Sequence, residues 1–255
     1  MKPYQNYHQY YIVLSSAHNQ DQDEIDTYAM SNDYVLNNNE PVNQQIYRFL
    51  RGDIVDCTIP PGTLLSEKEI STRFSVSRQP VREAFIKLAE SGLVQILPQR
   101  GTFVMKISAK RVADGRLIRE AVESAIIRRA ATLITAEQLT LIEHNLHRQE
   151  LAAQNKQTNE FLILDDEFHR MLTQIADCPL AWETIENIKA TMDRVRFLSL
   201  NNVSPPENLI AQHHRIVDGL RNHDPDQAER AIHEHLQEMI YSIKPISTQN
   251  SEWFE

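Results

Sequence analysis

Hydrophobic residues recur every three or four positions in the first ordered part of the chain, and this is the spacing of an amphipathic helix. Ile46, Phe49, Leu50 and Ile54 carry the period. The Pro and Gly residues of TIPPG at 58–62 interrupt it and end the predicted helix.

Two further helices and a hairpin are predicted next. Ser66 and Glu69 form an S-x-x-E capping box, which predicts a short helix to about Phe74. After a tight turn, Ser77 can cap another helix, which ends before Gly92. The β-prone runs LVQILP and GTFV then predict a two-stranded hairpin. The predicted order of elements is helix, helix, tight turn, helix and hairpin. This is the order found in a winged helix-turn-helix.

The rest of the chain has a helical pattern divided by capping signals. Thr135 pairs with Gln138, and Ser204 and Asp224 each precede a proline, as N-cap residues do. The predicted helices span 109–133, 136–154, 159–176, 180–200, 207–222 and 226–243. Short loops between antiparallel helices make a bundle. The expected fold class is therefore mainly α: an N-terminal winged helix-turn-helix followed by an all-α antiparallel bundle.

Composition and charge support this division. Residues 1–40 are rich in Asn, Gln, Tyr and acids without a sustained period, so we expect a disordered tail. Residues 41–106, the winged module, carry nine Lys and Arg against six acids in a chain of net charge −9. Such a basic island indicates a polyanionic partner. The bundle is expected at 107–245, and a C-terminal tail at 246–255.

Other features bear on the compartment. The apolar runs are far shorter than the roughly 20 residues that a bilayer requires, and the start MKPYQNYHQYYIVL lacks the apolar core of a signal peptide. Cys57 and Cys178 have no metal-type spacing and are interpreted as reduced thiols. A cytoplasmic protein with no membrane partner is expected.

The helix after the tight turn carries residues suited to reading DNA. Arg78 and Arg82 are four residues apart, hence on one helix face, and each guanidinium can pair with guanine O6 and N7. Lys68 and Arg73 on the preceding helix, and Arg100 at the hairpin tip, are placed to contact phosphates. The alternative is that these are ordinary solvated cations balanced by nearby acids.

Three predicted bundle helices place polar residues on their apolar faces. At about 100° per residue, Asp165 falls inside an apolar stripe and His169 borders it, while His213 and His235 lie in the stripes of two later helices. An unpaired buried carboxylate costs several kcal/mol. One Asp and three imidazoles suit Zn²⁺, Ni²⁺ or Mn²⁺. A hydrogen-bonded Asp–His cluster without metal is the alternative.

The basic module resembles the DNA-binding domain of GntR-type transcription regulators. The resemblance runs from PGTLLSEKEI through VSRQPVREAFIKLAESGLV to RGTFV and matches S-R-x-P-V-R-E-A-[LF]-x-x-L-x-x-x-G-L-V followed by R-G-x-x-V. It implies that Lys68, Arg78, Arg82, Arg100 and Gly101 contact DNA. Lys68 stands where the family often has Arg, which retains a phosphate contact but loses bidentate geometry.

The bundle resembles the all-helical FCD effector domain of the FadR branch of these regulators. That pattern reads D-x-x-x-H, then H-x-x-[IL], then H-L, and Asp165, His169, His213 and His235 occupy its positions. The resemblance implies a divalent metal, zinc first with nickel or manganese as alternatives. The metal would help to hold a small carboxylate or sugar-acid effector.

The resemblance also places Arg119, in IREAVE, in the wall of the effector cavity. A simple i,i+4 pair with Glu123 is the alternative. The leading hypothesis is a metabolite-responsive transcription factor, with a repressor role implied by a close relative. It would act as a homodimer, because a symmetric operator needs two reading heads. The effector must bind one arrangement of the heads better than the other.

Two rival functions fit parts of the sequence. The first is a metal-dependent enzyme acting on a small acid, with the basic domain as an accessory. Against it, no H-E-x-x-H, nucleophile elbow or phosphate loop is present. The second is an architectural DNA-binding protein with a structural bundle. Such a bundle would not require polar residues at the centres of three buried faces.

Overall fold

The computed structural model describes residues 35–255, apart from the side chains of residues 201 and 202. The predicted tail at 1–40 therefore lies, as far as residue 34, outside the described residues. Its last residues contact the first helix: the Gln45 side chain accepts from Asn37 N and donates to the Asn37 carbonyl, both at 2.8 Å. Glu40 forms an ion pair with Arg48 at 2.8 Å.

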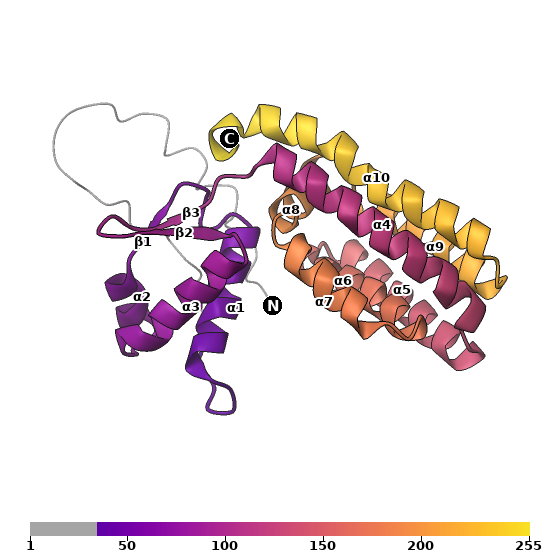
Figure 1. The fold of residues 1–255 in the computed structure, drawn as a ribbon, viewed down its shortest axis with the longest axis horizontal. Helices are drawn as coiled ribbons and strands as arrows, with labels where there is room; N and C mark the ends of the chain where they lie inside the picture. The colour runs from indigo at the N-terminus through magenta and orange to yellow at the C-terminus, as the bar shows by residue number, and fades with distance from the viewer. Residues whose placement is uncertain (1–34) are drawn as a thin grey trace.

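The N-terminal half consists of three helices and a small sheet (Figure 1). The helices are α1 (Val42–Val55), α2 (Glu67–Arg73) and α3 (Arg78–Glu90), and the strands are β1 (Leu64–Leu65), β2 (Val94–Leu97) and β3 (Gly101–Val104). Ile46, Leu50 and Phe85 are among the residues of its apolar core. The predicted winged helix-turn-helix is confirmed with one correction. The hairpin carries a third strand, since β1 pairs with β3 in the sheet order β1-β3-β2.

The C-terminal half is a helical bundle. Its elements are α4 (Ala109–Leu133), α5 (Ala136–Gln154), α6 (Thr158–Ile175), α7 (Pro179–Lys189), α8 (Asp193–Asn202), α9 (Pro206–Arg221), α10 (Pro225–Gln249) and a 3-10 turn (Ser251–Trp253). In Figure 1, α4 and α10 run side by side along the bundle. None of the described helices is long and apolar enough to cross a membrane.

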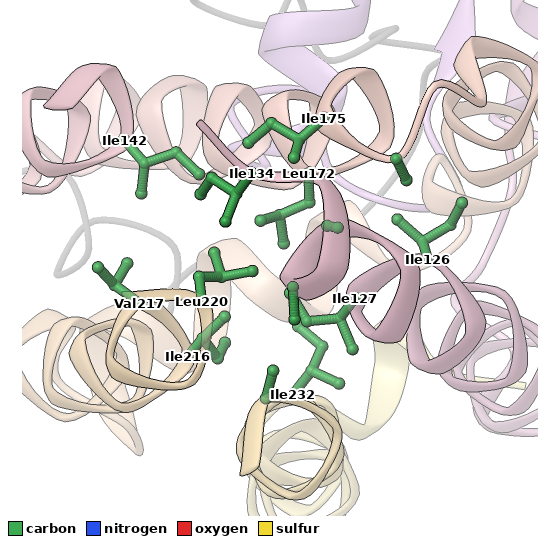
Figure 2. Packing of buried hydrophobic residues seen from close by; sticks show 14 of the residues in the cluster. Ile126, Ile127, Ile134, Ile142, Leu172, Ile175, Ile216, Val217, Leu220 and Ile232 are labelled. Atoms are coloured by element: carbon green, nitrogen blue, oxygen red, sulfur yellow. The ribbon is translucent and has the colours of Figure 1, made fainter. Parts of the chain in front are cut away.

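An isoleucine- and leucine-rich core holds the bundle together. Figure 2 shows side chains from several helices pointing into it, among them Ile127 of α4, Leu172 of α6, Ile216 of α9 and Ile232 of α10. The α9–α10 pair is close at Gly219, where a Cβ would lie 2.6 Å from the backbone nitrogen of Ala228. The predicted bundle fold is thus confirmed.

The predicted helix 180–200 is wrong as a single element, because it is broken into α7 and α8 at residues 190–192. Ile188, Met192 and Val195 keep helical spacing across the break and share one apolar cluster. Periodicity therefore does not reveal the break. The break depends on packing that the local sequence does not encode.

The predicted C-terminal tail, 246–255, is also corrected at its start, because α10 continues to Gln249. Ile246 is fully buried and packs in one cluster with Ile107. Beyond it, Ile107 N donates to the Trp253 carbonyl at 2.8 Å. Tertiary packing thus keeps this segment helical past Pro245 and holds the following residues against the linker between the halves.

Two of the three predicted bundle caps are confirmed. Thr135 and Gln138 form a complete capping box, and Asp224 accepts from two first-turn N–H groups of α10. Ser204 is not the cap of α9. Its hydroxyl donates instead to Glu238 Oε1 on α10, at 2.8 Å.

Candidate metal centre and DNA-binding face

Four buried side chains converge inside the bundle. Asp165 and His169 come from α6, His213 from α9 and His235 from α10. One donor atom of each lies within 4.8 Å of the others, and no side chain among them is exposed. The structure therefore brings together all four residues that the sequence selected as ligands.

A hydrogen bond fixes the orientation of each imidazole. The acceptors that face the Nδ1 atoms are Glu123 Oε2 for His169 at 2.6 Å, Gln149 Oε1 for His213 at 2.8 Å and Gln212 Oε1 for His235 at 2.9 Å. The Gln149 amide is oriented by its own bond from Nε2 to Asn145 Oδ1, at 2.8 Å. Since a carboxylate or amide oxygen faces each Nδ1, that nitrogen is the donor, and each Nε2 is directed inward.

These inward atoms lie close together. His169 Nε2 lies 3.2 Å from His235 Nε2. Within residues 35–255, neither Asp165 Oδ1 nor His213 Nε2 has a hydrogen-bond partner, although they lie 3.4 Å apart. Burial lowers the pKa of His213 to about 3 and that of His235 well below its usual value, so both rings are neutral. Facing lone pairs of this kind fit a divalent cation.

The remaining oxygen of Asp165 is held from outside the cluster. Arg196 on α8 donates to Asp165 Oδ2. Burial alone would raise the pKa of Asp165, but the positive charge of Arg196 holds it well below the usual value. The carboxylate is therefore charged, and its Oδ1 atom faces the histidines.

A cavity of about 60 Å³ adjoins the cluster and includes Asp165 and His235 in its wall. Since one water needs about 10–15 Å³ by this measure, the cavity has room for a few waters or a small organic acid. Arg116, Arg119 and Arg196 also line it.

Arg119 combines the two alternatives considered for it. Its Nε donates to Glu123 Oε1, as in the expected i,i+4 pair. Its Nη2 is buried and has no hydrogen-bond partner among the described residues. Because the same side chain lines the cavity, an anion there would satisfy a guanidinium nitrogen that is otherwise unpaired.

Sequence reasoning missed Gln149, Gln212 and Arg196. A signal for Gln149 exists: it shares a helix face with Ile142 and Leu146, and it is fully buried. The same helical-face test that selected Asp165 would have found this glutamine. The contact of Arg196 depends on how α8 packs, so no comparable local signal identifies it.

The predicted DNA-contacting residues lie on α2, α3 and the wing. Arg78 and Arg82 are exposed on α3, Lys68 is exposed on α2, and Arg100 is exposed at the tip between β2 and β3. Arg73 is half-buried on α2. These four exposed side chains are accessible to a DNA duplex. Arg78 and Arg82 lie on α3, the second helix of the helix-turn-helix, which such folds place in the major groove.

Two of these positions have further local structure. Gly101 has φ +112°, a conformation that L side chains rarely adopt, so the glycine lets the wing turn. Arg82 is paired with Glu67, whose two carboxylate oxygens accept from Nε and Nη2 at 3.0 Å each. The side chain of Arg82 remains 56% exposed, so this pair is open to competition from a phosphate or a base.

Comparison with known proteins identifies the class. Residues 42–104 match the model of the gntR family of bacterial regulatory proteins, and residues 116–238 match the FCD domain. The chain therefore belongs to the GntR family of DNA-binding transcriptional regulators and carries an FCD domain. It is 59% identical over 219 residues to the HTH-type transcriptional repressor RspR of Escherichia coli K12, across 86% of this chain and 96% of RspR.

Solved structures share the fold. E. coli McbR/YncC superimposes with a TM-score of 0.69 at 18% identity, covering 82% of this chain and 99% of that one. A GntR regulator from Rhodococcus sp. RHA1 gives 0.67 at 24% identity, covering 79% and 97%. The sequence relatives are transcriptional regulators, so the chain is a regulator and the enzyme hypothesis is set aside.

The Arg82–Glu67 pair leads to a first prediction. Glu67→Gln is expected to raise DNA affinity by about two- to fivefold, because exposed ion pairs are worth about 0.2–1 kcal/mol and Arg82 would be released. Fluorescence anisotropy with labelled duplex measures the change. Glu90→Gln, on α3, removes the same charge without touching this pair. An equal gain in both variants would show that only net charge matters.

Proposed function

We propose that this protein is a repressor that binds a symmetric operator as a homodimer in the cytoplasm. A small carboxylate or sugar acid, bound beside a divalent metal, controls its operator affinity. The observation that carries the proposal concerns Arg119, which lines a cavity beside the Asp–His cluster and whose buried Nη2 has no hydrogen-bond partner among residues 35–255. Arg119 is ion-paired with Glu123, but a buried guanidinium nitrogen without a hydrogen-bond partner is still costly, and an anionic ligand would satisfy it.

Asp165, His169, His213 and His235 would hold the metal. Zinc suits three imidazoles and one carboxylate, and nickel or manganese are the alternatives. When bound, the ion supplies positive charge that attracts a ligand carboxylate. The outer bonds from Glu123, Gln149 and Gln212 keep the rings oriented whether or not an effector is present.

The cavity wall supports a hydroxylated acid as the effector. Arg116, Arg119 and Arg196 line the cavity, and a ligand carboxylate would compete with the acidic partner that each of them already has. Ser199 and Ser242 also line the cavity; Ser199 Oγ donates to Ser242 Oγ at 2.7 Å, and the hydroxyl oxygens can still accept from a ligand hydroxyl group. The small volume favours a short molecule.

The repressor role is supported by the 59% identity to RspR, whose name states that role. The homodimer is supported by the symmetry argument: one winged head reads one half-site, and two heads match a palindrome. Effector binding must then stabilise one relative arrangement of the two winged domains over another.

Arg119→Gln tests the effector site. Short hydroxy acids and sugar acids are screened for release of a duplex that the protein selects from a random pool. A charge-assisted hydrogen bond contributes about 1.5–3 kcal/mol, so the variant should need at least about tenfold more of any active acid. Arg128→Gln is the matched control, because Arg128 lies on the same helix but is paired on the surface with Asp226 and Glu229.

Two results would contradict the proposal. One is an unchanged half-effect concentration in Arg119→Gln for an acid that releases DNA from the wild type. The other is that none of the acids releases DNA. Equal losses in Arg119→Gln and Arg128→Gln would point to helix stability rather than to ligand contact.

A further inference from the structure

A series of ion pairs, buried at Asp165, Arg196 and Asp193 and partly exposed at Arg51, leads from Asp165 to the DNA-binding half. Arg196 donates to Asp165 Oδ2 and, through Nη1 at 3.0 Å, to Asp193 Oδ1. The other oxygen of Asp193, Oδ2, accepts from Arg51 of α1. Two side chains of α8 thus connect a residue of the Asp–His cluster to the first helix of the winged domain.

The series of ion pairs spans the break between α7 and α8. Lys189, the last residue of α7, is 2% exposed, and its Nζ lies 2.7 Å from Asp193 Oδ1 and 2.8 Å from Asp166 Oδ2. Asp193 is the first residue of α8. The break that the sequence did not predict is therefore bridged by buried charges, so any movement of α8 changes the contacts of Asp193.

The charges in this series of ion pairs balance one another. The acids are Asp165, Asp166 and Asp193, and the bases are Arg51, Lys189 and Arg196. A divalent ion at Asp165 would add positive charge at one end. An anion in the cavity would compete for Arg196, which lines the cavity wall. Either event shifts how strongly Arg196 is drawn toward Asp193.

A gain in folding stability is a poor explanation for these ion pairs. Apolar residues of similar size often replace a buried ion pair with no loss of stability, whereas removal of one partner is costly. The same directional contacts can, however, hold two packed elements in a defined relative position. Here those elements are α8 of the FCD domain and α1 of the winged domain.

We propose that Arg196 and Asp193 are positioning residues that couple occupancy of the Asp165 site to the placement of the DNA-binding domain through Arg51. The inference rests on the proposed function, since it assumes that the Asp–His cluster binds a divalent metal. Coupling of two sites is reciprocal: if metal changes DNA affinity, DNA changes metal affinity by the same factor.

The test uses zinc alone as the ligand. Full-length protein is stripped of metal, and its zinc affinity is measured by competition with a chromophoric chelator, with and without a saturating duplex selected from a random pool. In the wild type, DNA is expected to change the zinc affinity by about fivefold or more. In Arg51→Gln, the change should fall below about twofold, while the zinc affinity of the free protein is retained.

Arg48→Gln is the matched control. Arg48 lies one turn earlier on α1 and forms an exposed pair with Glu40, so the variant should retain the wild-type ratio. Asp193→Asn removes the same link from the other side and should also uncouple the two sites. Because Asp193 is more deeply buried than Arg51, thermal melting of both variants accompanies the titrations.

The outcomes separate the two proposals. The ratio compared is the zinc affinity with DNA over the zinc affinity without DNA. If this ratio were near one in the wild-type protein, or if a folded Arg51→Gln variant had the same ratio as the wild type, the coupling would be overturned and the metal centre would be left intact. If the DNA-free wild-type protein did not bind zinc, or if Asp165→Ala did not change its zinc binding, both the metal centre and the coupling would be overturned. Loss of the ratio in Arg48→Gln as well would assign the effect to α1 in general and reject the specific path.

Discussion

Arg78→Ala combined with Arg82→Ala is expected to lower affinity for the selected DNA by at least about 30-fold. Each bidentate contact between arginine and guanine is worth about 1–3 kcal/mol. Both side chains are exposed on α3, and the buried residues of that helix, Val81, Ala84 and Phe85 among them, occupy its other face. The substitutions should therefore leave the fold intact.

Anisotropy titrations at one fixed salt concentration measure this loss. Lys87→Ala is the control: it removes a cation from the last turn of the same helix, where Nζ lies over the Tyr47 ring at 4.4 Å. It is expected to cause a small loss. If the double variant lost equal affinity for unrelated DNA, the two arginines would contact phosphates rather than base edges.

The second large effect concerns the metal centre. Protein purified without chelator should contain nearly one divalent ion per chain, and Asp165→Ala combined with His213→Ala should contain almost none. Ligand at 100 times its Kd stabilises by about 2.7 kcal/mol, and one kcal/mol shifts Tm by about 2–4 °C at this chain length. Zinc should thus raise the wild-type Tm by about 5–10 °C, and it should leave the double variant unchanged.

Elemental analysis and thermal melting provide the two readouts. The control removes two other metal-competent histidines, His147 and His214, which are exposed and share Glu150 as a partner. This variant should retain the metal and the zinc response. Metal-free wild-type protein, or metal retained in the Asp165 and His213 double variant, would refute the ligand assignment.

Local sequence determined much of the architecture. The spacing of apolar residues placed most of the helices, because a helix that buries one face must repeat its apolar residues at the helical period. The capping pair Thr135 and Gln138 marks a boundary that the structure reproduces. Polar residues inside an apolar stripe, such as Asp165 and His213, indicated a shared buried site before any contact was known.

Other features required the tertiary structure. The α7–α8 break, strand β1 and the continuation of α10 past Pro245 depend on long-range packing or pairing. Ser204 has the sequence context of a cap, but a partner on another helix engages its hydroxyl. Local rules give the preferences of a segment, and contacts between distant segments can outweigh them.

The sequence by itself determined the two-part fold and selected Arg78 and Arg82 as candidates for DNA contact and four polar residues as candidate ligands, because each selection depends on residues a few positions apart on one helix. Only the tertiary structure decided which atoms of the ligand candidates face one another and that Arg119 Nη2 lacks a hydrogen-bond partner in the part of the protein that the structure describes. It alone joined Arg51 to Asp193. Residues so distant in sequence share no helical period, so their contact follows from how the two domains pack.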